Sequence, residues 1–253
     1  MSRSSMKRPL HDETARGPTL PSLDPGLHLV DIDERAVGVV QSLVIDHVLT
    51  DQSTGSTAVW VDSNGVATTS SLSRVVPSMR LLERIRVARA FTAYQHHSLV
   101  SQLPEDVDES TPLVVVPEFE YQYRSPDMRF GVAHDLVETG IQTLSTLARE
   151  RELPILVTRE TTAPLSAPIV EAADSVLGCE LTRFGPRFVG EEFETLVYPV
   201  DGGFQTTLSY WAEILSVRFQ AVQEGSTPRS PSVPASTDSV PMSPPEVSVD
   251  GTH

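Results

Sequence analysis

Short apolar runs alternate with helical patterns along most of this chain. The runs have the length of buried strands and lie at residues 27–30, 58–61, 85–88, 113–116 and 154–158. Between them, apolar residues three or four positions apart predict helices over 36–49, 77–83, 92–103 and 129–152. Because strands that are apolar throughout must be covered on both faces, this alternation predicts an α/β fold with a mostly parallel central sheet flanked by helices.

The pattern changes after residue 174. Residues 175–182, 187–189 and 193–198 have the alternation and turn residues of hairpin strands, so we expect a C-terminal β-hairpin extension of the sheet. The last 29 residues hold six prolines and seven serines, and residues 1–25 are short of apolar side chains. We therefore expect three parts: a disordered segment at 1–25, one domain at 26–215, and a helix end with a disordered Pro/Ser-rich tail at 216–253.

The charge is strongly one-sided. The chain carries 34 Asp and Glu against 19 Lys and Arg, a formal net charge of −15, and Lys7 is its only lysine. Loss of lysine together with a gain of carboxylates is typical of proteins adapted to molar intracellular salt, where the Debye length falls to about 3 Å and acidic surfaces repel one another weakly. The composition therefore predicts a halophilic protein, with a moderately acidic bacterial protein as the alternative.

Other features of the sequence indicate the cellular location of the protein. The single cysteine, Cys179, excludes a disulfide framework and a cysteine-based metal cluster. The sequence has no apolar run long enough to span a membrane, and residues 1–20 lack the apolar stretch of a signal peptide. We expect a cytoplasmic protein with no membrane partner.

Five motifs in one order resemble the RecA/RadA recombinase family. They are an Asp-x-x-Gly turn after a strand (Asp62–Gly65), the segment ARAFTAYQHH (88–97), an apolar strand followed by Tyr123-Arg124, the strand PILVTRE (154–160), and two strand-like segments around residues 173–184. The resemblance covers about residues 26–212 and implies a RecA-like P-loop NTPase fold. Together with the charge pattern, it indicates a halophilic archaeal source.

The same resemblance places a phosphate loop at residues 33–40, and the residues there do not suit phosphate. Gly38 matches the second glycine of the motif, but Asp33 stands for the first, Val39 for the lysine and Val40 for the Ser or Thr that holds Mg²⁺. Two carboxylates, Asp33 and Glu34, stand where phosphates need cations, and a like-charge contact at 4 Å costs about 4 kcal/mol at an effective dielectric near 20. Arg35 is the one cation beside them.

The other catalytic positions have changed as well. The strand that should end in a Mg²⁺-binding Asp ends in Pro117, with Glu118 and Glu120 displaced in register. Asn64 aligns with the family's catalytic carboxylate and cannot act as a base. Thr158-Arg159-Glu160 replaces a Thr-Asn-Gln sensor, which leaves Arg159 facing the site. We therefore predict a vestigial nucleotide site of Asp33, Arg35, Gly38, Asn64 and Arg159, with no catalytic residues and no cofactor.

Two further groups of side chains are candidates for a functional role. His96 and His97 are adjacent and so point in different directions, which argues against a metal site. Arginines form two local sets, and either they pair with the many carboxylates or they contact phosphates. Under the second interpretation, Arg86, Arg89, Arg183 and Arg187 are the residues expected to contact DNA or a partner.

The resemblance implies a catalytically inactive RecA/RadA-like protein, accessory or regulatory in DNA recombination or repair. Its expected partners are a RadA-type recombinase or DNA. Two alternatives remain. One is an active ATPase with an unconventional phosphate loop, in which Arg35 or Arg159 replaces the lysine and ATP and Mg²⁺ bind. The other is a KaiC-like regulatory oligomer.

Overall fold

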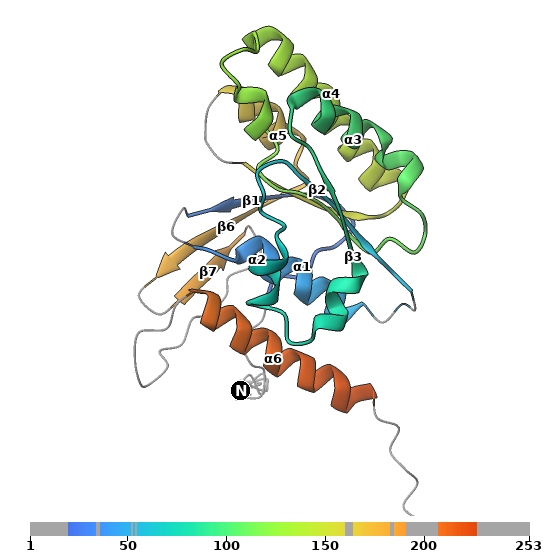
Figure 1. The fold of residues 1–253 in the computed structure, drawn as a ribbon, viewed down its shortest axis with the longest axis vertical. Coiled ribbons are helices and arrows are strands. Elements are labelled where there is room, and N and C mark those ends of the chain that lie inside the picture. Colours follow the sequence, from blue (N-terminus) through green and yellow to red (C-terminus); the bar gives the residue numbers. More distant parts are fainter. Residues whose placement is uncertain are drawn as a thin grey trace, which may run out of the picture.

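A seven-stranded sheet forms the centre of the computed structural model, in the order β3-β2-β4-β5-β1-β6-β7 (Figure 1). The structure describes residues 20–33, 36–51, 53, 55–159, 164–182, 185–190 and 207–226. All neighbouring strands are parallel except β7, which is antiparallel to β6. The strands are β1 (Gly26–Ile32), β2 (Ala58–Asp62), β3 (Ile85–Arg89), β4 (Val114–Val116), β5 (Pro154–Thr158), β6 (Ser175–Thr182) and β7 (Gly185–Val189).

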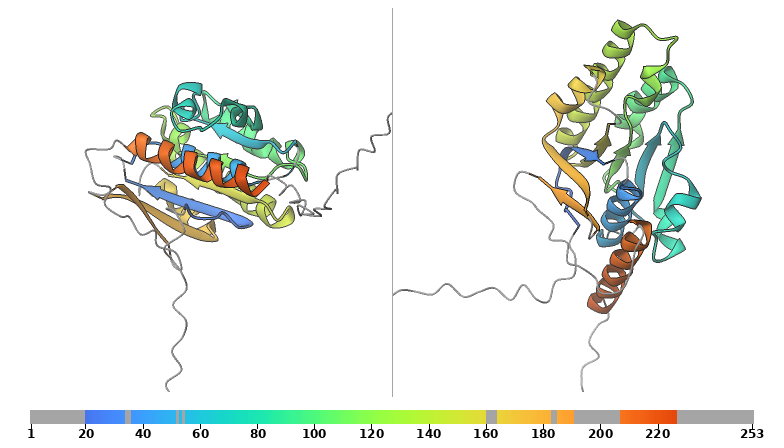
Figure 2. Two further views of the ribbon diagram at one scale, coloured as in Figure 1. Left: turned by 90° about the horizontal axis from the view of Figure 1, so that it is seen from below. Right: turned by 90° about the vertical axis from the view of Figure 1, so that its left-hand side faces the viewer.

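Helices cover both faces of this sheet, as the apolar strands require (Figures 1 and 2). The first face carries α1 (Val39–Thr50), α2 (Thr69–Ser73), the 3₁₀ helix η2 (Met79–Arg84) and α6 (Thr207–Ser226). The second face carries α3 (Ala93–Asp106), α4 (Phe130–Glu150) and α5 (Ala167–Ala172). The 3₁₀ helices η3 (Tyr121–Arg124) and η4 (Pro164–Ser166) lie in the connections before α4 and α5.

The expected α/β class and the mostly parallel sheet are confirmed, and each expected strand from 27 to 158 is present. Two local expectations need correction. The helix expected from residue 36 begins at Val39, so Val37 precedes α1 and is exposed. The helix expected over 77–83 is the 3₁₀ helix η2. The hairpin expected after residue 174 is present in β6 and β7, and β6 joins it to the main sheet by pairing in parallel with β1.

The expected domain limits also differ from the packing. Leu20 and Leu23 are buried in the core of the first face, so the packed region includes residues before 26. The limit at 215/216 falls inside the continuous helix α6. Residues 1–19, the strand expected at 193–198 and the tail from 227 lie outside the described residues.

Helix α1 lies between the sheet and α6, and almost all of its side chains are buried. A helix that is buried on nearly all sides needs such a double cover. Trp211, Ile214 and Leu215 of α6 supply its outer layer, and Figure 2 shows the two helices side by side. No helix among the described residues combines the length and the apolarity that a membrane span requires.

Candidate functional site

The carboxyl ends of the parallel strands meet at one edge of the sheet, where open α/β sheets bind their ligands. The chain leaves β1 toward α1 on the first face, and it leaves β4 and β5 toward α4 and α5 on the second face. The crevice predicted by topology therefore lies at the ends of β1, β4 and β5. Residues expected in the vestigial site come from these ends and from β2.

Arg159 and Asp31 are joined across the ends of β5 and β1. Arg159 Nε donates to Asp31 Oδ1 at 2.6 Å, and Nη2 donates to Oδ2 of the same carboxylate. The hydrogen bonds to Asp31 raise the pKa of the Arg159 guanidinium. Because both carboxylate oxygens are used by this one cation, the charge of Arg159 is neutralised by the protein itself.

Asn64, which follows β2, is hydrogen-bonded to Glu118 at the end of the neighbouring strand β4. Its Nδ2 donates to Glu118 Oε2 at 2.5 Å, while the Glu118 amide donates to Thr158 Oγ1 at 2.8 Å. Glu118 has a positive φ of 49°, which turns the chain sharply after β4. Hydrogen bonds thus run from β2 through β4 to β5, where the Arg159–Asp31 pair continues to β1. The structure brings Asn64 and Arg159 to one edge, and sequence reasoning missed Asp31 and Glu118 as their partners.

The start of α1, where the chain arrives from β1, is covered by α6. Gly38 has a φ of 86° and immediately precedes α1, and Val39 and Val40 behind it are buried. A β-carbon on Gly38 would lie 2.7 Å from Leu208 Cδ2 and 3.3 Å from Trp211 Cδ1. Phosphate binding at a helix start requires access to the first backbone N–H groups, and here apolar side chains of α6 lie against that turn. Asp33 lies at the end of β1, where its amide donates to the Cys179 carbonyl at 2.9 Å. Arg35 is outside the described residues.

The arginines expected to contact DNA or a partner do not form one surface. Arg86 and Arg89 are on β3 and Arg187 is on β7, at opposite edges of the sheet. Arg89 donates to the fully buried Asp62 at 2.9 Å and Arg86 to the Asp106 carbonyl at 3.0 Å, while Arg187 lies 3.6 Å from Glu180. Arg183 lies outside the described residues. Arg89 and Arg187 thus lie with carboxylates, which was the alternative to phosphate binding, whereas Arg86 donates to a backbone carbonyl.

His96 is a core residue. Its Nδ1 is hydrogen-bonded to Tyr123 Oη at 2.8 Å, its ring packs edge-on against Phe119, and burial lowers its pKa to about 4. The neutral ring is unsuited to act as an exposed acid or base. Tyr123 is likewise buried, so it cannot stack on a nucleic-acid base.

One group of described residues has the atoms for a metal ion. His134, Asp135 and Glu138 of α4 place a nitrogen and two carboxylate oxygens within 4.8 Å of one another. Asp135 and Glu138 are exposed and His134 is half-buried, and His134 Nδ1 is 3.8 Å from Glu138 Oε2. Exposed groups of this kind form readily on an acidic surface without a metal, so this geometry alone assigns no ion.

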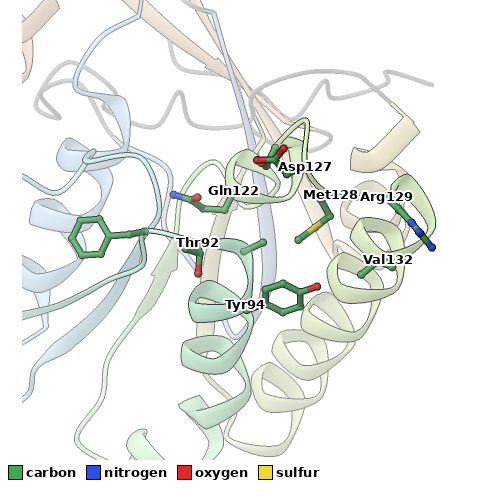
Figure 3. Close-up of a pocket in the computed structure, with 10 residues that line it drawn as sticks. Thr92, Tyr94, Gln122, Asp127, Met128, Arg129 and Val132 are labelled. Atoms are coloured by element: carbon green, nitrogen blue, oxygen red, sulfur yellow. The ribbon is translucent and has the colours of Figure 1, made fainter.

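A pocket of about 520 Å³ opens at the same edge of the sheet, between the starts of α3 and α4 (Figure 3). We call it the α3–α4 pocket. Its lining includes Phe91, Tyr94, Gln122, Asp127, Met128, Arg129 and Val132. Tyr94 extends from α3 toward Met128 and Val132 at the beginning of α4. Sequence reasoning missed this pocket because its residues come from two connections that only the parallel sheet brings together.

The fold and this edge define an α/β protein with a mostly parallel sheet whose β1–α1 junction is covered. No protein-family model matches the chain, and no curated protein matches it at a significant level. Its function must therefore be argued from the site.

Proposed function

We propose that this chain is a RecA-like protein of the P-loop NTPase fold that has lost ATPase activity. It acts in the cytoplasm of a halophilic cell as an accessory or regulatory protein in DNA recombination or repair, by binding a RadA-type recombinase or DNA. The five sequence motifs support the family, and the mostly parallel sheet with a helix after β1 agrees with it. The role in recombination rests on the sequence resemblance.

The covered junction of β1 and α1 is the observation that carries the loss of activity. Leu208 and Trp211 lie against Gly38, and the first turn of α1 is buried beneath α6. Val39 stands where the family has lysine, and no side chain of Val39 or Val40 can neutralise phosphate or bind Mg²⁺. Arg159, the cation expected to face the site, is held by Asp31. The steric cover by α6 and the missing positive charges both disfavour nucleotide binding.

Calorimetric titration of the full chain with ATP and Mg²⁺ in molar KCl tests this loss. We expect no binding heat and no release of inorganic phosphate, with an active ATPase of the RecA family in the same buffer as the positive control. Micromolar binding or turnover would instead support the alternative of an ATPase with an unconventional loop.

Binding to the expected partners requires a second experiment. The purified chain is mixed in molar KCl with the RadA-type recombinase of the same cells and, separately, with a labelled single-stranded oligonucleotide. Binding of either supports the role in recombination, and absence of both removes it. Light scattering on the same sample distinguishes a monomer from a ring, and a ring would favour the KaiC-like alternative.

A further inference from the structure

Two exposed aromatic side chains line the α3–α4 pocket: Phe91 is 73% exposed and Tyr94 is 65% exposed. A third, Phe130, is 60% exposed and follows the lining residue Arg129 as the first residue of α4. Within the described ranges these are the only exposed Phe, Tyr or Trp side chains. Exposed aromatic side chains around a hollow are typical of protein interaction sites, because covering them removes a large apolar area from water.

Two polar side chains of the pocket lining, Gln122 and Thr92, are held by the protein. Gln122 Nε2 donates to the Ser63 carbonyl at 2.6 Å, and the Thr92 hydroxyl accepts from the Gln95 amide at 3.2 Å. These bonds fix the connection after β4 and the start of α3. The apolar surface of Tyr94, Met128 and Val132 is therefore offered by a preorganised site, which lowers the entropy cost of binding.

The charge at the mouth favours a carboxylate in the occupant. Arg129 is the N-cap residue of α4, its side chain makes no capping hydrogen bond, and it has no ion-pair partner among the described residues. Neither α3 nor α4 has an acidic residue in its first turn, although the chain carries 34 Asp and Glu. Asp127 is the one carboxylate in the lining. Arg129 can therefore be neutralised by a partner.

We propose that the α3–α4 pocket docks a short segment of another protein that carries an aromatic or aliphatic anchor next to an acidic residue. The anchor packs on Tyr94, Met128 and Val132, and the acidic residue pairs with Arg129. This inference rests on the proposed function, because it names the surface through which a protein partner binds. Nucleic acid fits less well, since tracking a phosphate backbone takes several cations and this pocket offers Arg129 beside Asp127.

Selection from a displayed library of random peptides tests the proposal with the full chain as bait. We expect enrichment of peptides in which Phe, Trp or Leu is adjacent to Asp or Glu. A selected peptide is then synthesised and titrated. Tyr94→Ser should weaken its binding at least tenfold, as loss of a central aromatic contact does. Arg129→Gln should remove the preference for acidic over neutral peptides while the aromatic preference remains.

Val217→Ser is the matched control, because Val217 is an exposed apolar residue of α6 on the opposite face of the sheet. It should leave peptide binding unchanged. The substituted residues are exposed, so the thermal midpoints of all three variants should stay close to that of the original chain. A shifted midpoint identifies a folding defect, and Phe91→Ser then serves as the second pocket variant.

Three outcomes would overturn the proposal: no enrichment of peptides, enrichment of basic peptides, or selected peptides that bind the Tyr94→Ser and Phe91→Ser variants as tightly as the original chain. Binding of a labelled oligonucleotide that Tyr94→Ser abolishes would assign the pocket to nucleic acid instead. Other outcomes test the proposed function independently of the docking site. If a recombinase binds the Tyr94→Ser variant normally, the proposed function stands and the proposed docking site is wrong. ATP turnover by the original chain would contradict the proposed function and leave the docking proposal unaffected.

Discussion

Leu208 of α6 lies against Gly38 at the start of α1, so closely that a β-carbon on Gly38 would be 2.7 Å from Leu208 Cδ2. The contact joins two segments separated by 170 positions in the sequence. It also gives the glycine a packing role, whereas its motif position predicts a phosphate-binding role. Several measurable consequences arise from this contact and from the ion pairs around it.

Gly38→Ala should destabilise the protein more than Gly65→Ala. Both glycines have positive φ, 86° and 73°, so each substitution costs roughly 1 kcal/mol of backbone strain. Only at Gly38 must Leu208 also move, since nothing lies within 4 Å of a β-carbon on Gly65. We expect an additional loss of about 1 kcal/mol at Gly38, measured by urea unfolding. Equal losses, or no recovery in the Gly38→Ala/Leu208→Ala double variant, would contradict the contact.

Arg218→Met should destabilise the protein more at neutral than at acidic pH. Arg218 of α6 forms an ion pair with the buried Asp46 of α1. Burial raises the pKa of Asp46 and Arg218 opposes the rise, so without the arginine the pKa rises further. A raised carboxyl pKa means that the folded state binds the proton more tightly, so stability is retained below the unfolded pKa and lost as pH rises through the folded pKa.

We expect a loss of about 2 kcal/mol for Arg218→Met at pH 7, since it leaves a buried charge without its partner. The loss should shrink as the pH falls toward the unfolded pKa of aspartate. Denaturant midpoints measured at several pH values follow this change. Asp46→Asn in the Arg218→Met background removes the charge and should also remove the pH dependence, and a dependence that persists would place its origin elsewhere.

His96 should make the fold sensitive to mild acid. Burial, and to a smaller extent the neighbouring His97, lower its pKa from 6.5 to about 4. A depressed histidine pKa means that the unfolded state binds the proton more tightly, so its contribution is complete above pH 6.5 and is lost as pH falls from 6.5 toward 4. The loss across this window is at most about 3 kcal/mol. His96→Phe should flatten the stability profile between these pH values, and an unchanged slope would assign it to another group.

Asp31→Asn tests whether charge pairing alone prevents nucleotide binding. The substitution releases Arg159 from its bidentate pair, yet it leaves Leu208 and Trp211 over the start of α1. We expect no binding heat with ATP and Mg²⁺, and a stability loss of about 1 kcal/mol for a partly buried pair. Nucleotide binding by this variant would show that the ion pair, and not α6, closes the site.

The two arginines of β3 should respond differently to substitution. Arg89 donates to Asp62, whose side chain is fully buried, so Arg89→Gln should cost about 2 kcal/mol. Arg86 is exposed and contacts only a backbone carbonyl, so Arg86→Gln should change stability by less than about 0.5 kcal/mol. Thermal unfolding of the two variants measures this difference in stability. Equal effects would mean that Arg89 does not act through Asp62.

The sequence alone determined the local elements and the class of the fold. Buried strands such as 113–116 are apolar at every position, and α4 repeats its apolar residues at helical spacing, so both can be identified without knowing their neighbours. Helix α6 also carries such a spacing, in Leu208, Trp211 and Leu215, and its start could have been predicted from it. Gly38 and Asn64 were identified as site positions because they occupy motif positions in the sequence.

Only the tertiary structure decided what those residues touch. Asp31 meets Arg159 because β1 is paired in parallel with β5, with Val30 opposite Thr158, and a register between strands 128 positions apart is set by the whole sheet. The cover of Gly38 depends on how α6 packs across α1, and the α3–α4 pocket depends on two connections that emerge at one edge. Local patterns follow from the periodicity of backbone geometry, whereas contacts between distant segments follow from packing the complete chain.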